Sequence, residues 1–254
     1  EARTGHNLPR ETLNSISLNK IAIKGPTATP SGSGHRSVNV RLRETFDLIM
    51  NVRPVVTTPV KTRYSDVPID LLILRMNLGD LYVGEEEQVP GGYAASAVFL
   101  YGECHAFARM AYEYAHRMRR SKMTIGHKSN ILKRTHGLFL DVVHTVAAAY
   151  PEIAVNDLLA DNLAMQLVMR PERFDCLLLP NFIGDLFSDM CAGFVGGLGF
   201  AAGANIGKEH AIFEAVHGTA PDIAGRGIAN PSALILSGAM MLDHLGEHSA
   251  AQNV

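Results

Sequence analysis

Short apolar runs alternate with longer amphipathic stretches along this chain, and that alternation limits its fold more than any other feature. Runs of about six residues, bounded by Gly, Pro or polar residues, predict buried strands at 20–25, 69–75, 122–127, 175–180 and 211–215. Apolar residues at helical spacing predict helices over 98–118, 136–149, 184–195 and 231–245. This order predicts an α/β fold with helices packed on a largely parallel sheet.

Segment 82–99 does not follow this alternation. Acidic residues precede Pro-Gly-Gly, and small and aromatic residues follow it. Two interpretations remain open: a solvated loop, and an arm that pairs with another subunit.

The composition is that of an ordinary globular protein, with 47% hydrophobic and 19% charged residues. A formal net charge of −2 argues against a nucleic-acid surface, which needs a basic excess. No run approaches the roughly 20 apolar residues of a membrane span, and residues 1–11 lack the apolar stretch of a signal peptide. The cysteines form no CxxC pair, so we expect buried, reduced thiols and a reducing compartment: the cytoplasm, or the mitochondrial matrix in a eukaryote.

Asp185 and Asp189 are four residues apart, so on a helix both carboxylates point to one face. Placed in the first turn, they would also suit the positive end of the helix dipole. Converging carboxylates repel unless a cation lies between them, and Mg²⁺ or Mn²⁺ prefers oxygen ligands. The alternative is one capping and one solvated aspartate. Asp161 is a third carboxylate, and it too could cap a helix.

Arginines and two proton-transfer candidates accompany these carboxylates. Arg75 ends an apolar strand and is costly to leave unpaired there, so it is expected to face a cleft. Guanidinium groups of Arg43, Arg53 and Arg75 would suit a substrate with several carboxylates, with surface salt bridges as the alternative. Tyr82 and Lys128 are candidates for proton transfer, against a packed tyrosine and a solvated lysine.

A glycine-rich stretch, 196–207, lacks the strand–GxGxxG–helix order and is therefore no Rossmann fingerprint. We interpret it as a loop of small residues that lets the backbone approach a flat or phosphorylated ligand. Segment 217–222 adds a histidine, a hydroxyl group and an acid. An acid near a nucleotide ribose would accept hydrogen bonds from its hydroxyls and repel a 2′-phosphate.

These residues are similar to the isocitrate, isopropylmalate and homoisocitrate dehydrogenase family, from Leu8 to Leu245. Residues 24–54 resemble the family's substrate and nicotinamide loop, 127–133 its lysine motif, 181–207 its metal-binding signature and 217–231 its adenosine-binding loop. The family usually opens with a further strand, glycine loop and helix, and closes with a further C-terminal helix. We therefore expect the sequence to be a truncated piece of a family member.

The resemblance implies an α/β fold of the isopropylmalate dehydrogenase type, with a central mixed sheet flanked by helices. It implies a discontinuous large domain that binds the cofactor, 1–48 and 197–254. It also implies a small domain, 49–196, that holds the dimer interface and the metal and substrate residues. Active sites would be shared within a homodimer or higher oligomer.

For single residues, the resemblance implies that Arg43, Arg53 and Arg75 bind the substrate carboxylates, with hydrogen bonds from Ser37 and Asn39. The metal would be held by Asp185, Asp189 and the partner subunit's Asp161. Lys128 of the partner subunit would help remove the hydroxyl proton, and Tyr82 would protonate the enol left after loss of CO₂. Thr29 would lie near the nicotinamide, and the cofactor loop would contribute Glu214, His217, Gly218, Thr219, Ala220, Asp222 and Asn230.

The implied reaction is NAD- and Mg²⁺- or Mn²⁺-dependent oxidative decarboxylation of a 2-hydroxy acid. Asp222 and Ile223 resemble NAD-using members, since NADP users typically carry Lys-Tyr there. Ser37 and Asn39 favour isocitrate over 3-isopropylmalate, whereas the C-terminal half is also similar to homoisocitrate enzymes. The overall likeness is greatest to NAD-dependent isocitrate dehydrogenase.

A non-catalytic regulatory subunit is the main alternative, and a Mg²⁺-dependent hydrolase is a distant one. The stretch 75–82 favours the regulatory alternative, because two acids and a hydroxyl typical of isocitrate enzymes are replaced at positions 76, 78 and 79. Local hydrogen bonds that orient Arg75 or Tyr82 are therefore expected to be missing.

Overall fold

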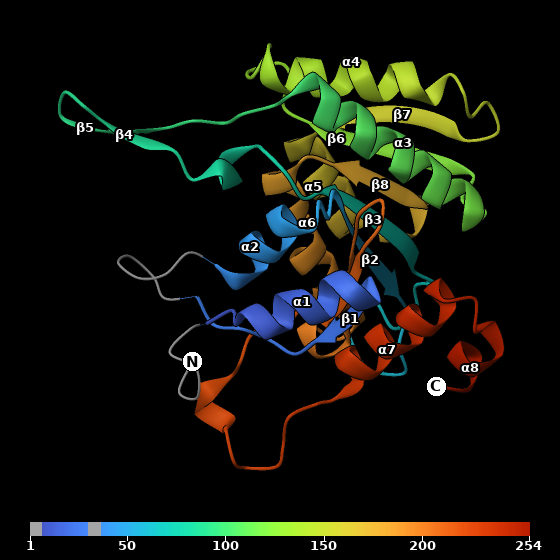
Figure 1. Ribbon diagram of the computed structural model, residues 1–254. Coiled ribbons are helices and arrows are strands. Elements are labelled where there is room, and N and C mark those ends of the chain that lie inside the picture. Colours follow the sequence, from blue (N-terminus) through green and yellow to red (C-terminus); the bar gives the residue numbers. More distant parts are fainter. Residues whose placement is uncertain (1–6, 30–36) are drawn as a thin grey trace. The chain divides into compact units, whose positions relative to one another are not determined.

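The computed structural model describes residues 7–29 and 37–254, so positions 30–36 of the predicted substrate and nicotinamide loop lie outside the described residues. The chain divides into two compact units, one combining Glu1–Leu48 with Gly197–Val254 and the other Ile49–Gly196. Both are α/β, with mixed sheets flanked by helices (Figure 1). Within the described residues no helix has the length and apolarity needed to cross a membrane.

The sheet of the discontinuous unit contains β1 (Ile21–Lys24), β10 (Ala211–Ala215) and β9 (Ala202–Ile206). β1 runs parallel to β10, and β10 runs antiparallel to β9. Helix α7 (Ser232–His244) packs against all three strands, and α8 (His248–Asn253) packs on α7. Helices α1 (Arg10–Asn19) and α2 (Val38–Thr45) contribute apolar residues to a core that includes Ile16, Leu42 and Ile212.

Strand β9 corrects the interpretation of 196–207 as a loop. Its five residues, AGANI, are all buried, and α7 packs against them. Glycine and alanine have low strand propensity, but their small side chains leave room for a helix to approach the sheet closely. The loop interpretation is therefore wrong for the second half of this stretch.

The second unit has strands in the order β2 (Met50–Val56), β3 (Asp70–Met76), β8 (Cys176–Leu179), β6 (Lys122–His127) and β7 (Ala154–Leu159). The order β3, β8, β6, β7 is parallel throughout, whereas β2 is antiparallel to β3. The sheet is therefore mixed, as the family resemblance implied. β2 was not predicted, because Arg53 and Pro54 interrupt its apolar pattern.

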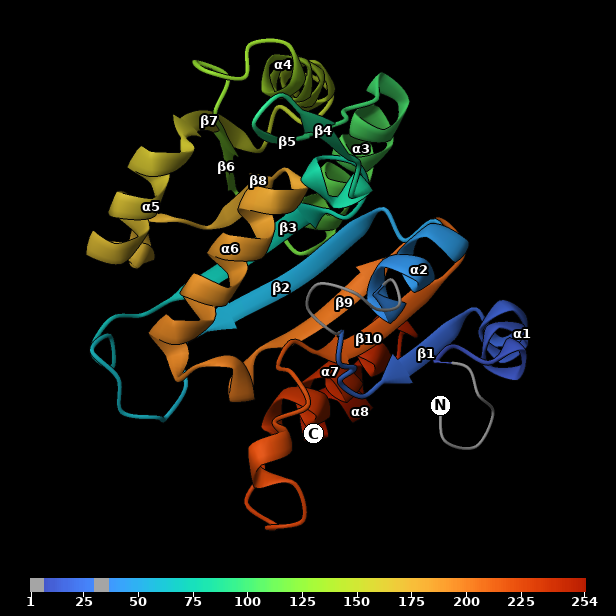
Figure 2. The ribbon, with the colours of Figure 1, turned by 90° about the vertical axis from the view of Figure 1, so that its left-hand side faces the viewer.

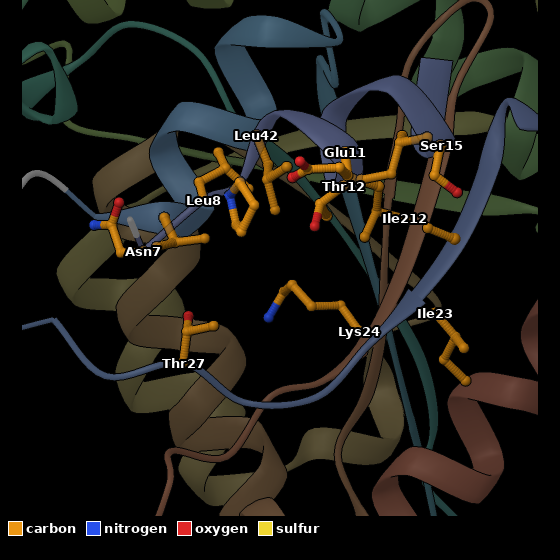
Figure 3. Close-up of a pocket in the computed structure, with 14 residues that line it drawn as sticks. Asn7, Leu8, Glu11, Thr12, Ser15, Ile23, Lys24, Thr27, Leu42 and Ile212 are labelled. Carbon is orange, nitrogen blue, oxygen red and sulfur yellow. The ribbon is translucent and has the colours of Figure 1, made fainter. Parts of the chain in front are cut away.

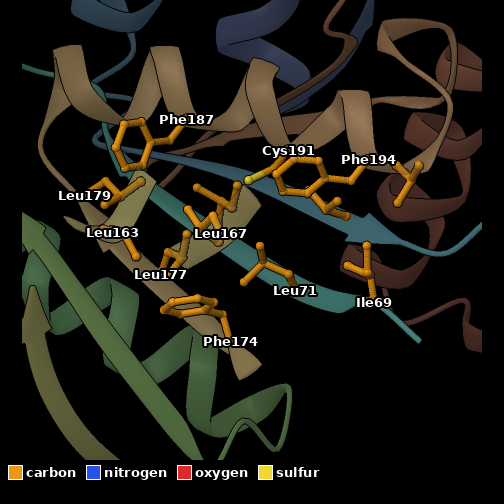
Figure 4. Packing of buried hydrophobic residues seen from close by; sticks show 13 residues of the cluster. Ile69, Leu71, Leu163, Leu167, Phe174, Leu177, Leu179, Phe187, Cys191 and Phe194 are labelled. Atoms are coloured by element: carbon orange, nitrogen blue, oxygen red, sulfur yellow. The ribbon is translucent and has the colours of Figure 1, made fainter. Parts of the chain in front are cut away.

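Two helices cover each face of this sheet, α3 (Tyr101–Arg117) with α4 (Thr135–Ala147) and α5 (Ala160–Met169) with α6 (Asn181–Ala192) (Figure 2). Between α5, α6 and the sheet lies an apolar core that includes Leu163, Leu177, Phe187 and Cys191 (Figure 4). The core fixes α6 directly after β8, at the carboxyl end of parallel strands, where functional groups collect in α/β folds.

Segment 82–99 contains a hairpin of β4 (Glu86–Val89) and β5 (Gly92–Ala95). It lies at the end of an extended ribbon, apart from the five-stranded sheet of its unit (Figure 1). Its residues are mostly exposed, Tyr93 to 79%. A two-stranded hairpin is marginally stable alone, so this geometry favours the arm interpretation over a solvated loop.

Candidate active site

Arg75 stands near the carboxyl end of β3, and α6 holds its guanidinium group inside the second unit. The side chain is only 1% exposed. Its Nε and Nη2 donate to Asn181 Oδ1 at 3.1 and 2.7 Å, and its Nη1 pairs with Asp185. Burial lowers the pKa of Arg75, and the carboxylate of Asp185 opposes that shift. A buried charge must be compensated in this way. Within the single chain Arg75 is closed in by Asn181 and Asp185, so its predicted position facing a cleft is not seen there.

The close approach of α6 to Arg75 depends on Gly184. A Cβ atom at this position would lie 2.6 Å from Arg75 Cγ and 2.9 Å from Arg75 Cβ. Real Cβ atoms do not come so close to other carbons. Only glycine therefore lets the helix pass over the arginine stem while Asp185, one residue later, reaches the guanidinium group.

Tyr82 lies in a short 3₁₀ turn, Leu81–Val83, and its hydroxyl donates a hydrogen bond to Asp185. The Arg75 guanidinium carbon stands 5.0 Å from the centre of its ring, within cation–π range. Burial raises the pKa of Tyr82, against the opposing charge of Arg75. The phenol is therefore protonated at neutral pH and suited to donate a proton. Helix α6 supplies hydrogen bonds to both side chains, through Asn181 and Asp185. The expected loss of local bonds concerns positions 76, 78 and 79 and stays a prediction.

Arg53, on β2, joins both aspartates of α6. Its Nη1 donates to Asp189 Oδ1 at 2.7 Å and to Ser188 Oγ at 2.6 Å, and its Nη2 lies 3.9 Å from Asp185 Oδ1. Asn51 Oδ1 accepts from its Nε at 2.8 Å. Two arginines and two aspartates thus form one cluster, the arginine–aspartate cluster. Its carboxylates remain accessible, since Asp185 is 37% and Asp189 50% exposed.

The prediction that Asp185 and Asp189 share one helix face is confirmed by their common contact with Arg53. Their predicted place in the first turn is wrong. α6 begins at Asn181, so both carboxylates lie beyond the first turn, where the helix dipole has little effect. The arginines, rather than the dipole, therefore compensate them.

Lys128 follows β6 and pairs with Asp161, in the first turn of α5, at 2.6 Å. This hydrogen bond lowers the pKa of Asp161. The backbone N–H of Lys128 donates to Nδ1 of His136 at 3.1 Å, and the burial of His136 lowers its pKa. His136 is thus a neutral acceptor beneath the turn that carries Lys128.

Asp185 and Asp189 offer oxygen donors of the kind that Mg²⁺ and Mn²⁺ prefer. In the described part of the chain, however, no three His, Cys, Asp or Glu residues are grouped so that they could hold a metal ion. A single chain does not bring Asp161 to the other two aspartates. The donor chemistry fits the expected cation, provided that a further carboxylate comes from another subunit.

In the discontinuous unit, Arg43 and Glu214 belong to a buried polar group. Arg43 Nε donates to Asn205 Oδ1 at 3.2 Å, and Asn205 Nδ2 donates to Glu214 Oε1 at 2.7 Å. Lys24 pairs with Glu214 at 2.6 Å. Burial acts to raise the pKa of Glu214, but the charges and hydrogen bonds of Lys24, Arg43 and Asn205 together lower it. Lys24 and Asn205 were not predicted, although Lys24 ends its strand much as Arg75 does.

Replacing Glu214 with glutamine is expected to destabilise the protein at neutral pH by about 1–3 kcal/mol, because Lys24 loses its buried counter-ion. The folded-state pKa of Glu214 is below the ordinary value, so its stabilising contribution is present above pH 4–5 and is lost as pH falls through the folded-state pKa. Urea unfolding at neutral and acidic pH should therefore show a difference between wild type and Glu214→Gln that shrinks in acid. A constant difference would contradict an ionised Glu214.

The remaining predicted residues of this unit lie at its surface or on its loops. Thr29 is exposed, Ser37 precedes α2, and Asn39 Oδ1 accepts from Thr27 at 3.3 Å. In the loop before α7, the predicted residues Gly218, Thr219, Ala220, Asp222 and Asn230 are all exposed. His217 Nδ1 lies 2.9 Å from the carbonyl oxygen of Gly218, and Asn230 Oδ1 accepts from the N–H of Ser232 at 3.0 Å.

A cavity of about 520 Å³ opens between α1, β1 and α2. The side chain of Lys24 extends into it from β1, facing Thr12 and Glu11 of α1 (Figure 3). Its described lining includes none of the predicted site residues. The cavity therefore does not by itself mark the predicted cofactor site.

Asp80 was not predicted, although it bonds both the turn that carries Tyr82 and the helix that carries Asp185. Its carboxylate accepts the N–H groups of Leu81 and Phe182, each at 2.8 Å, and the residue is 3% exposed. An aspartate between glycine and leucine carries no signal that separates it from a surface-loop residue.

Comparisons with known proteins agree with the family resemblance. A sequence model described as isocitrate/isopropylmalate dehydrogenase matches residues 2–254. The chain is 47% identical to a regulatory subunit of the mitochondrial NAD isocitrate dehydrogenase of Dictyostelium discoideum, covering 99% of this chain and 71% of that protein. It is 46% identical to catalytic subunit 5 of the mitochondrial enzyme of Arabidopsis thaliana, covering 100% and 68%.

The fold has a close counterpart among solved structures. Isocitrate dehydrogenase from Methylococcus capsulatus superposes with a TM-score of 0.94 and 47% identity, over 99% of this chain and 75% of that chain. Sequence and structure therefore lead to the same assignment: the chain belongs to the isocitrate/isopropylmalate dehydrogenase family.

Proposed function

We propose that this protein is an NAD-dependent dehydrogenase that oxidatively decarboxylates a 2-hydroxy acid, with isocitrate as substrate and 2-oxoglutarate as product. The observation that carries the proposal is the arginine–aspartate cluster with Tyr82. It joins two guanidinium groups, two accessible carboxylates and a protonated phenol on adjoining elements. Homoisocitrate and 3-isopropylmalate are the alternative substrates.

Different residues of the chain are proposed to bind the substrate and the metal. Arg53 and Arg75 bind substrate carboxylates, as guanidinium groups do in pairs of hydrogen bonds. Asp185, Asp189 and the partner's Asp161 would hold Mg²⁺ or Mn²⁺, whose positive charge would lower the pKa of the substrate alcohol.

Proton and hydride transfer then follow from the chemistry of the substrate. Lys128 of the partner subunit would take the proton from the hydroxyl oxygen, and bound NAD⁺ would supply the hydride acceptor for the carbon that bears this hydroxyl. Loss of CO₂ leaves an enol, and Tyr82 donates its proton to the enol carbon. Tyr82 holds that proton at neutral pH, since a tyrosine pKa is ordinarily about 10 and burial raises the pKa of Tyr82 further.

For the discontinuous unit we propose the cofactor role, with Arg43, Ser37 and Asn39 reaching the substrate and Thr29 the nicotinamide. Glu214, buried against Lys24, would lie at the base of this cofactor site. Asp222 lies exposed in the loop before α7, where its carboxylate would accept hydrogen bonds from the ribose hydroxyls and its charge would repel the 2′-phosphate of NADP. The remaining loop residues, His217, Gly218, Thr219, Ala220 and Asn230, would contact the adenosine.

We further propose a homodimer, or a higher oligomer built from it, with shared sites. Exposed apolar side chains gather on α5 and α6, the helices that carry Asp161 and the metal-binding aspartates: Met165, Val168, Met169, Phe182 and Leu186. Apolar exposure on this scale is typical of surfaces that another chain covers. The β4–β5 hairpin offers a second contact, because it lacks strand partners within the described residues of its own chain.

We assign the protein to a reducing compartment, the cytoplasm or the mitochondrial matrix. Its three cysteines are buried and free, and burial raises the pKa of Cys104 and Cys191 to about 12. Such thiols are inert. Both relatives compared above are named as mitochondrial proteins.

A regulatory subunit is the second candidate function. The 47% identity to a protein named as a regulatory subunit favours it, as do the replaced residues at 76, 78 and 79. Retention of Tyr82, Lys128, Asp161, Asp185 and Asp189 together favours catalysis instead.

The test is to follow NADH formation by the purified protein with NAD⁺, Mn²⁺ and each of isocitrate, homoisocitrate and 3-isopropylmalate. We expect turnover with isocitrate, abolished in Asp185→Asn. A folded dimer that forms no NADH with any acid would overturn the enzyme assignment in favour of the regulatory one. Turnover with homoisocitrate alone would correct the substrate.

A further inference from the structure

Asp80 joins the two elements that bring the proposed proton donor and the proposed metal-binding residues together. One carboxylate oxygen accepts the N–H of Leu81, at the start of the turn that carries Tyr82. The other accepts the N–H of Phe182, in the first turn of the helix that carries Asp185. Both distances are 2.8 Å, and Asp80 is 3% exposed, so water does not compete for these bonds.

The backbone of Asp80 is also held in place. Its N–H donates to the carbonyl oxygen of Val98 at 2.7 Å, which forms an isolated antiparallel bridge. Its φ and ψ are 58° and −154°, a conformation that residues with side chains rarely adopt. The two carboxylate hydrogen bonds thus hold Asp80 in a backbone conformation that it would otherwise avoid. That conformation sets the direction in which the chain continues to Tyr82.

We propose that Asp80 is a positioning residue, which fixes the Tyr82 turn to the first turn of α6 so that the phenol stays at Asp185. It does not touch the reacting atoms. Its role rests on the proposed function, because Tyr82 matters only if it transfers the proton. Asn181 supports the same junction, donating to the carbonyl oxygen of Gly79 at 3.2 Å.

Two substitutions separate positioning from stability. Asp80→Gly removes both carboxylate bonds but relieves the unfavourable φ, so its melting temperature should stay within a few degrees of wild type. Asp80→Asn keeps one acceptor and tolerates positive φ, so it retains part of the positioning. We expect turnover to fall in the order Asp, Asn, Gly, with a loss on the order of 10- to 100-fold for Asp80→Gly. Stability should not follow that order.

The readout must report proton transfer rather than folding. Exchange of hydrogens next to the carbonyl of the 2-oxo acid with solvent deuterium, with Mg²⁺ and NADH present, isolates the step assigned to Tyr82. In Asp80→Gly it should slow as much as turnover does, while KM changes less than threefold. The matched control is Asp47→Gly, the same substitution at another aspartate of positive φ (48°). Asp47 is exposed, so this substitution should leave turnover unchanged.

Amide hydrogen exchange provides a measurement that needs no activity. The N–H groups of Leu81 and Phe182 should lose protection in Asp80→Gly. Wild-type turnover in that variant, or unchanged protection of both amides, would overturn the proposal. If the wild type neither oxidises an acid nor exchanges product hydrogens, the proposed function fails, whereas the amide protection still decides whether Asp80 holds the turn.

Discussion

Replacing Gly184 with alanine is expected to reduce turnover on the order of 100-fold, because the new methyl group displaces Arg75. The Cβ would meet three carbons of the Arg75 side chain at 2.6, 2.9 and 3.2 Å. Arg75 is 1% exposed and cannot move outward without breaking its bonds to Asn181 and Asp185. A displacement of about 1 Å in a binding group costs roughly this factor in rate.

The same substitution should also lower the free energy of unfolding by about 1–2 kcal/mol. Overpacking a tight site costs about 1–3 kcal/mol, and alanine returns up to about 1 kcal/mol through its higher helix propensity. Gly137→Ala is the matched control, since Gly137 is also helical and its Cβ would meet nothing within 4 Å. It should be neutral or slightly stabilising and fully active. Equal behaviour of the two variants would refute the close packing of α6 on Arg75.

Two inactive variants are expected to restore activity when mixed, if the active site is shared between subunits. Lys128→Met should lose at least about 100-fold in turnover, the usual contribution of a proton-transfer group. Asp185→Asn should lose at least about as much, because it removes a proposed ligand of the metal. After exchange of subunits, a mixed dimer carries one site with Asp185 from one chain and Lys128 from the other, both intact. About a quarter of all sites should then be functional.

The control for this experiment combines two residues that the same chain contributes to a site. Tyr82 donates to Asp185 within one chain, so mixing Tyr82→Phe with Asp185→Asn leaves every site with one defect. No recovery is expected there. Recovery in this control, or none in the first mixture despite exchange confirmed by mass spectrometry, would rule out the proposed division of residues between subunits.

Much of the fold could be predicted because its main strands are apolar and short. Strands β3, β6, β8 and β10 and the four long helices appear where the pattern places them, with ends shifted by a few residues. The strands β2 and β9 could not be predicted, for opposite reasons. Arg53 and Pro54 break the apolar run of β2, and the glycine and alanine residues of β9 are held in a strand by pairing with β10 and by α7, which packs against them. Tertiary contacts override local propensity at both places.

The candidate site was predictable in its residue types but not in its pairings. The four-residue spacing of Asp185 and Asp189 indicates a shared face, and the position of Arg75 indicates a partner. Nothing local indicates that this partner is Asp185, or that Lys128 pairs with Asp161, 33 residues away. Asp80 acts through backbone N–H groups, which every residue but proline has, so no residue pattern could indicate it.

The distances along the sequence within the arginine–aspartate cluster have a consequence for folding. Arg75 and Asp185 are 110 residues apart, and Arg53 and Asp189 are 136 apart. The parallel pairing of β3 with β8, which places Arg75 beside Leu179, must form before α6 can present its carboxylates. Contacts of such long range form slowly, because the closure of a long loop precedes any gain from them. During refolding from urea, helical content should therefore return well before the ion pairs of Arg53 and Arg75 with the aspartates form. Catalytic activity should be the last property that the chain recovers.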